Sequence, residues 1–125
     1  LADNTLRKKI AARFGLTVPV FTSWITVVTL TRNACCHHAR VWNKENAISP
    51  MIPRRLSDRW IVSNVSPKRI CINICIIRWF IDIVSPNNDM LEHLLALLAE
   101  YPMIDTRAMG FPQNWQDEPL WSTRC

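Results

Sequence analysis

Residues that could cleave a phosphodiester are concentrated in segment 32–43, which reads Arg-Asn-Ala-Cys-Cys-His-His-Ala-Arg-Val-Trp-Asn. Arginine is permanently charged and fork-shaped, which suits it to phosphate oxygens. Histidine takes up and releases protons near neutral pH, so it can act as a general acid or base. Arg32, Asn33 and His37 therefore form a minimal set of groups for breaking a phosphodiester without a metal ion.

The spacing of these residues limits how one helix can present them. Asn33 and His37 are four residues apart and His37 and Arg40 three, so the three share a helix face. Arg32 precedes His37 by five residues and points about 140° away on a regular helix. Either the helix ends or unwinds there, or a second copy of the segment completes the site, which predicts a homodimer across it.

The neighbouring His38 lies on the apolar side, where we expect a supporting role rather than catalysis. Cys35–His38 resembles a set of zinc ligands, but adjacent helical residues diverge by about 100° and cannot surround one ion. A zinc site would need Cys35 and His38 together with Cys71 and Cys75. Cysteines on apolar helix faces are more often small core residues, so we expect neither a metal ion nor another cofactor.

The charged residues are distributed unevenly along the chain. Its 125 residues suit one domain, and the net charge is +5. Residues 1–60 hold ten Lys/Arg and three Asp/Glu, whereas residues 61–125 hold five and seven. A basic front half suggests a polyanion partner such as nucleic acid, but charge alone slightly favours a solvated surface that serves solubility. The candidates to contact an RNA backbone are Arg7, Lys8, Lys9, Arg13 and Lys44.

The number of cysteines and the length of the apolar stretches indicate in which cellular compartment the protein is found. Five cysteines form no obvious disulfide framework and no secretory signal is visible, so we expect a reducing cytoplasm. The apolar stretches 16–31 and 70–84 are too short or too polar to span a bilayer, and we expect no membrane contact.

Hydrophobic periodicity predicts an all-α chain with helices at 4–14, 18–42, 66–84 and 89–100. A strand through 25–31 is the rival to the second helix. A connecting loop, 44–66, includes one short helix near 55–60, and 103–125 forms an irregular tail. The expected inward residues are Leu6, Ile10 and Phe14, then Ile70, Ile74, Ile77 and Ile81, then Leu91, Leu94, Leu95 and Leu98.

Other conspicuous side chains are expected to be structural. The six tryptophans should belong to the core, and Met109, Phe111, Trp115, Leu120 and Trp121 should pin the tail to the helices. Asp117 and Glu118 are expected to be solvated, and His93 is given no role.

Three blocks of the sequence resemble a known family. Arg32–His37 fits the R-X4-H form of the HEPN motif, and segment 32–43 resembles the R-N-x-C-A-H-H-x-R-L-W-N signature of Abi-like phage abortive-infection proteins. Cys36 replaces an alanine and Val41 a leucine. Leu6–Trp24 resembles the family's upstream segment, and 109–121 resembles its closing M-G-F-P-x-x-W-x-x-x-P-L-W pattern.

The resemblance implies a HEPN-like helical bundle that commonly dimerises with its motifs facing each other. Family members are longer, so residues 1–125 would be a single, C-terminal part of such a domain, with an incomplete bundle. Arg32 and His37 fall on the catalytic pair and Asn33 on the accessory polar position, with His38 and Arg40 supporting them.

The activity implied is metal-independent RNA cleavage through attack by the 2′-hydroxyl, in phage defence or a toxin–antitoxin system. RNA would be the substrate, and a neutralising antitoxin or phage trigger a further partner. The alternatives are a non-catalytic RNA- or protein-binding helical module, or an inactive truncated family member.

Overall fold

Every regular element in the described part of the chain is a helix. The computed structural model describes residues 4–36, 50–52, 60–61, 65–66, 68–103 and 105–122, except for the side chains of residues 4, 33–36 and 122. Its elements are α1 (Asn4–Arg13), α2 (Val18–Cys36), α3 (Ile70–Val84), α4 (Met90–Glu100), the 3₁₀ helix η1 (Trp115–Asp117) and α5 (Pro119–Ser122). These ranges contain no strand, so the all-α prediction is confirmed and the strand alternative over 25–31 is wrong.

Helix boundaries agree with the sequence except at the start of α3. That helix begins at Ile70 rather than at residue 66, because Ser66 forms a turn. The Lys68 N–H donates to Ser66 Oγ at 3.3 Å, and the Arg69 N–H donates to the Ser66 carbonyl at 3.3 Å. The predicted end of the second helix at residue 42 and the short helix near 55–60 lie outside the described residues.

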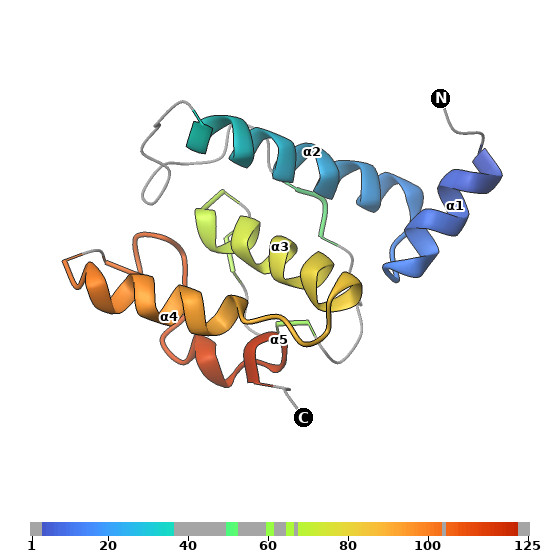
Figure 1. The fold of residues 1–125 in the computed structure, drawn as a ribbon. Helices are drawn as coiled ribbons and strands as arrows, with labels where there is room; N and C mark the ends of the chain where they lie inside the picture. Colours follow the sequence, from blue (N-terminus) through green and yellow to red (C-terminus); the bar gives the residue numbers. More distant parts are fainter. Residues whose placement is uncertain are drawn as a thin grey trace.

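Helix α3 is the centre of the molecule, between α2 on one side and α4 and α5 on the other (Figure 1). The predicted core-facing stripe is confirmed in part: Ile70 is buried and Ile74 packs against the core, whereas Ile77 and Ile81 are only half-buried. The buried apolar side chains of α3 are Ile70, Cys71, Ile72, Cys75, Ile76 and Trp79. A helix covered on more than one side needs apolar residues around most of its circumference.

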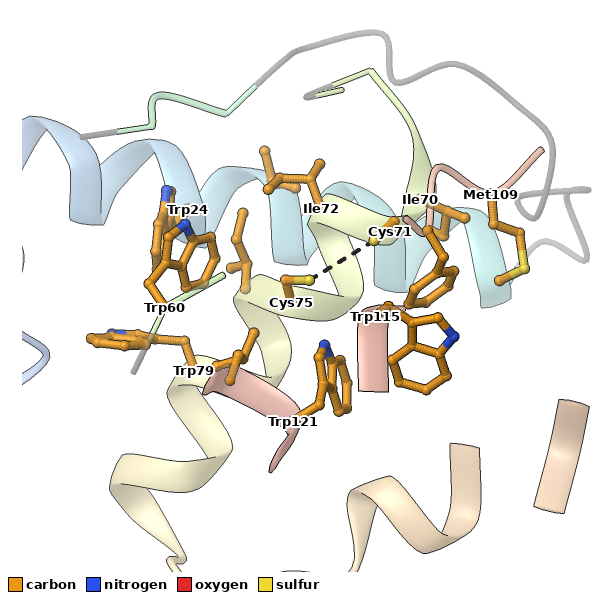
Figure 2. Close-up of a cluster of buried hydrophobic side chains, with 14 of the residues drawn as sticks. Trp24, Trp60, Ile70, Cys71, Ile72, Cys75, Trp79, Met109, Trp115 and Trp121 are labelled. Atoms are coloured by element: carbon orange, nitrogen blue, oxygen red, sulfur yellow. Dashed lines mark hydrogen bonds between the residues drawn. The ribbon is translucent and has the colours of Figure 1, made fainter. Parts of the chain in front are cut away.

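Aromatic side chains join α2 to α3. Trp24 stacks on Trp60 with ring centroids 5.1 Å apart, and Trp79 meets Trp60 edge-on at 5.8 Å (Figure 2). The Trp79 indole N–H donates to the Phe14 carbonyl at 2.8 Å, and that of Trp24 to the Met51 carbonyl at 2.8 Å. Burial of both rings therefore leaves neither indole N–H without an acceptor.

The prediction that the tryptophans belong to the core is confirmed for the five that the structure describes. Trp60, Trp115 and Trp121 are buried like Trp24 and Trp79, and Trp42 lies outside the described residues.

The closing segment, residues 109–121, is part of the core. Its Met109 carbonyl accepts the Cys71 N–H at 2.7 Å, and Met109, Phe111, Trp115, Leu120 and Trp121 are buried as predicted. Gly110 has φ +95°, and a Cβ there would lie 2.6 Å from the Arg69 Cβ. Only glycine fits this crossing of the segment over α3.

Arg78 links three parts of the chain although its residue is only 1% exposed. Its Nε lies 3.0 Å from Asp82 Oδ2 and donates to the Leu120 carbonyl at 3.3 Å. Its Nη1 donates to Asn88 Oδ1 at 3.1 Å, and its guanidinium lies 5.2 Å from the centroid of the Trp121 ring. One buried cation thus connects α3, the α3–α4 turn and α5.

Asn88 is itself saturated with hydrogen bonds. Its Nδ2 donates to Asp82 Oδ1 and to the Ser85 carbonyl, both at 2.8 Å. Its Oδ1 also accepts the Met90 N–H at 3.1 Å. The amide therefore fixes the start of α4 relative to α3.

Helix α1 does not bury the face that periodicity predicted. Leu6 and Ile10 are exposed, Phe14 is half-buried, and the fully buried residue of α1 is Ala11. The chain turns at Gly15, whose φ is +70°, and α1 bends from α2 by 69°. Only the end of α1 nearest the turn therefore reaches the core.

Helix α4 lies on the opposite side and is also incompletely covered. The predicted inward residues Leu91, Leu94, Leu95 and Leu98 do pack against the core. None of them is fully buried, and no residue of α4 is. A mostly apolar helix is thus left half in contact with solvent.

The substitution Arg78→Met tests the buried cation. It keeps the aliphatic bulk but leaves Asp82 in an apolar setting without its charge partner. We expect the free energy of unfolding, measured with urea, to fall by about 3 kcal/mol. Arg107→Met, at an exposed position, is the control and should change stability by less than about 0.5 kcal/mol. Equal losses in the two variants would contradict this role of Arg78.

Candidate functional site

Arg32 is the one member of the predicted catalytic set whose side chain the structure describes. It is exposed, one turn before the end of α2 at Cys36. Asn33 follows it in the same helix, but its side chain lies outside the described part, as do His37, His38, Arg40 and Lys44. The convergence of Arg32 with His37, within or between copies, therefore stays a prediction.

The register of α2 next to Arg32 is fixed by a part-buried hydrogen bond. Asn73 of α3, 4% exposed, donates from Nδ2 to Thr31 Oγ1 at 2.7 Å. The Thr31 hydroxyl in turn donates to the Val27 carbonyl at 2.8 Å. Because successive helical residues diverge by about 100°, holding Thr31 against α3 directs Arg32 away from the interface and toward solvent.

The basic residues of α1 lie far from Arg32. Arg7, Lys8, Lys9 and Arg13 are all exposed, but α1 joins α2 at its first residue, Val18, whereas Arg32 lies near its other end (Figure 1). Arg32 lies fourteen positions after Val18 in the helix, about 21 Å along its axis. An RNA that touches both would have to run along α2.

The two described cysteines form a buried pair. The Sγ atoms of Cys71 and Cys75 are 3.9 Å apart, and both thiols are free. The contact with Cys75, burial and the charge of Glu118 raise the pKa of Cys71 far above its ordinary value. The protonated thiol is a poor nucleophile and a poor metal ligand.

The zinc alternative receives no support from this pair. Cys35 and His38, the other two ligands it would need, lie outside the described side chains. Within those that are described, no group of three or more His, Cys, Asp or Glu could hold a metal ion.

Sequence reasoning missed three buried polar residues. Asn73 and Arg78 looked like polar interruptions of an apolar stretch, and Glu118 was expected to be solvated. Glu118, which directly follows η1, is in fact buried, while its neighbour Asp117 is exposed as expected. A signal was available for one of them, since Arg78 and Asp82 have the i, i+4 spacing of a helical ion pair.

His93, which was given no role, is an exposed residue of α4. Its Nε2 lies 3.5 Å from Asp89 Oδ2. A surface pair of this kind adds little to stability.

Comparison with known proteins gives a match to the N-terminal part of the chain. Residues 1–43 match the family model described as Abi-like protein. This range contains the whole of α1 and α2 and both Arg32 and His37. The closing segment lies beyond it, so its resemblance to the family stays a prediction, as does the HEPN assignment. None of the curated proteins or solved structures matches the chain significantly.

Among the described residues, no single helix is long and apolar enough to cross a bilayer. Two segments, Thr5–Arg13 and Val18–Arg32, reach that composition together but are bent by 69°.

The substitution Thr31→Val tests the bond that fixes α2. It keeps the β-branched shape but removes the hydroxyl that accepts from buried Asn73, which should lower the free energy of unfolding by about 1–3 kcal/mol. Thr26→Val is the matched control, because the Thr26 hydroxyl is exposed and bonds only to the Thr22 carbonyl four residues back. It should cost less than about 0.5 kcal/mol. Equal effects in urea unfolding would show that Thr31 is not an anchor.

The raised pKa of Cys71 predicts a loss of stability in alkali. In the unfolded chain the Cys71 thiol ionises at about pH 8.5, whereas in the folded protein it stays protonated. The unfolded state therefore binds fewer protons at high pH, and stability falls as pH rises by up to about 1.4 kcal/mol per unit. Urea unfolding between about pH 8 and about pH 10 should show a shallower decline in Cys71→Ala. Parallel declines in both proteins would contradict this.

Proposed function

We propose that this protein is a metal-independent endoribonuclease that acts in abortive infection, a defence against phage. The observation that carries the proposal is the match of residues 1–43 to the Abi-like family model, because that range includes the complete Arg32–His37 motif. The exposed position of Arg32 on α2 supports it, since a group that binds a phosphate must be reachable from solvent.

In the proposed reaction His37 removes the proton from a ribose 2′-hydroxyl. The 2′-oxygen attacks the adjacent phosphorus, and the bond from phosphorus to the 5′-oxygen of the next nucleotide breaks. That oxygen receives a proton from an imidazolium, either the same His37 or the His37 of a second copy. The products are a 2′,3′-cyclic phosphate and a 5′-hydroxyl.

Arg32 has the electrostatic role in this scheme. Negative charge grows on the phosphate oxygens as the fifth bond to phosphorus forms, and a guanidinium can donate two parallel hydrogen bonds to them. Asn33 would orient His37 or the phosphate, with His38 and Arg40 as supporting groups. Arg7, Lys8, Lys9, Arg13 and Lys44 would contact the RNA backbone at sites away from the scissile bond.

A homodimer across the end of α2 is part of the proposal. On a regular helix Arg32 and His37 point about 140° apart, so two copies of the motif can supply complementary groups to one phosphate. A neutralising antitoxin or a phage-derived trigger would act on this assembly.

An RNA-cleavage assay in excess chelator, with end-group analysis, tests the proposal. Wild type should give cyclic phosphate and 5′-hydroxyl ends, and should leave an RNA with 2′-deoxy substitutions intact. Arg32→Ala and His37→Ala should each lower the rate at least about 100-fold, the scale of general acid–base catalysis. His93→Ala, at the exposed histidine of α4, is the matched control and should retain full activity.

Two results would reject the assignment. One is cleavage that survives Arg32→Ala or His37→Ala. The other is binding of RNA without cleavage of any sequence tested, which would favour the non-catalytic module.

A further inference from the structure

Two exposed apolar surfaces lie at opposite ends of the molecule. On α1, Leu6 is 48% exposed and Ile10 40%. After the last turn of α4, Met103 is 76% exposed, and Leu97 and Tyr101 are 52% and 43% exposed. Figure 1 shows α1 at one end and the last turn of α4 at the other. Clustered exposed apolar residues of this kind mark contact surfaces.

The charges around these two surfaces are opposite. Helix α1 contains Arg7, Lys8, Lys9 and Arg13 and no acidic residue. Residues 97–105 contain Glu100 and Asp105 and neither lysine nor arginine, and Arg107 follows two residues later. The same chain thus carries a basic apolar helix and an acidic apolar surface.

The basic and apolar residues of α1 are interleaved on one side of the helix. Leu6 and Ile10 are four residues apart, and Lys9 and Arg13 follow each of them by three, so the four side chains are neighbours. On α4, Leu97 and Tyr101 have the same four-residue spacing, with Glu100 and Asp105 nearby in sequence. An apolar contact flanked by opposite charges is therefore available between the two surfaces.

We propose that α1 of one copy docks on a second copy at the surface formed by Leu97, Glu100, Tyr101, Met103 and Asp105, hereafter the 97–105 surface. Like charges disfavour pairing α1 with α1, or the 97–105 surface with itself, so charge complementarity selects the head-to-tail arrangement. Because the surfaces lie at opposite ends, each copy uses one and leaves the other open, and assembly continues into chains of copies. This contact is separate from the pairing across α2 and does not depend on the proposed nuclease activity. In a docked copy, Lys9 and Arg13 contact the second copy and not an RNA backbone.

Site-specific crosslinking tests the contact. A photoreactive benzophenone amino acid replaces Ile10, and this light chain is mixed with isotopically heavy wild type at low salt. We expect light–heavy crosslinks from position 10 to residues 97–105, identified by mass spectrometry. The yield should fall at high salt, because the flanking charges are exposed and screened.

Placing one substitution in either partner tests the direction. Leu97→Asp in the heavy chain should reduce the light–heavy crosslink at least about tenfold. The same substitution in the light chain, which then supplies only its α1, should leave the yield unchanged and also shows that the variant folds. Ile25→Asp in the heavy chain is the control, at an exposed apolar residue of α2 outside both surfaces.

The possible failures are distinct. Crosslinks to residues 4–13, crosslinks to the end of α2, or the absence of light–heavy crosslinks would each overturn the head-to-tail contact. A yield that ignores Leu97→Asp in the heavy chain would do so as well. RNA cleavage is not part of the readout, so failure here leaves the nuclease proposal standing, and the reverse also holds.

Discussion

A buried guanidinium holds the described structure together. Arg78 is almost fully removed from water, which is very costly for a cation unless its partners are all in place. Those partners come from its own helix at Asp82, from the following turn at Asn88 and from α5 at the Leu120 carbonyl. Any arrangement of α3, α4 and the closing segment that lost one of them would strand a charge in an apolar setting, so the arrangement is fixed.

The sequence predicted the helices well but predicted their faces less well. Periodicity records which residues of a helix are apolar, not how many neighbours the helix will have. Around α3, covered on more than one side, Cys75 and Trp79 are more deeply buried than the predicted stripe through Ile74 and Ile77. For α1 the prediction overestimated burial. The bend after Phe14 leaves Leu6 and Ile10 exposed to solvent, and no local sequence pattern predicts that bend angle.

The residue types of the candidate site were predictable from the sequence. The contacts that position its helix were only partly predictable. Arg32 and His37 are recognisable by type and spacing alone. The hydrogen bond between Asn73 and Thr31 joins residues 42 positions apart. A polar residue within an apolar helix does not reveal from the sequence which distant residue it bonds to. The burial of Glu118 was not predicted for a related reason, because it depends on how the closing segment packs after η1.

The separation of Arg78 from Leu120 by 42 residues has a consequence for the protein during its synthesis. A ribosome that adds about 5–20 residues per second needs about two to eight seconds to travel from one to the other. Throughout that interval the nascent helix carries a cation whose final acceptor does not yet exist, beside apolar side chains that α5 will later cover. Until α5 has formed, the nascent chain therefore leaves exposed to water both the Arg78 guanidinium and the apolar side chains that α5 covers in the folded structure.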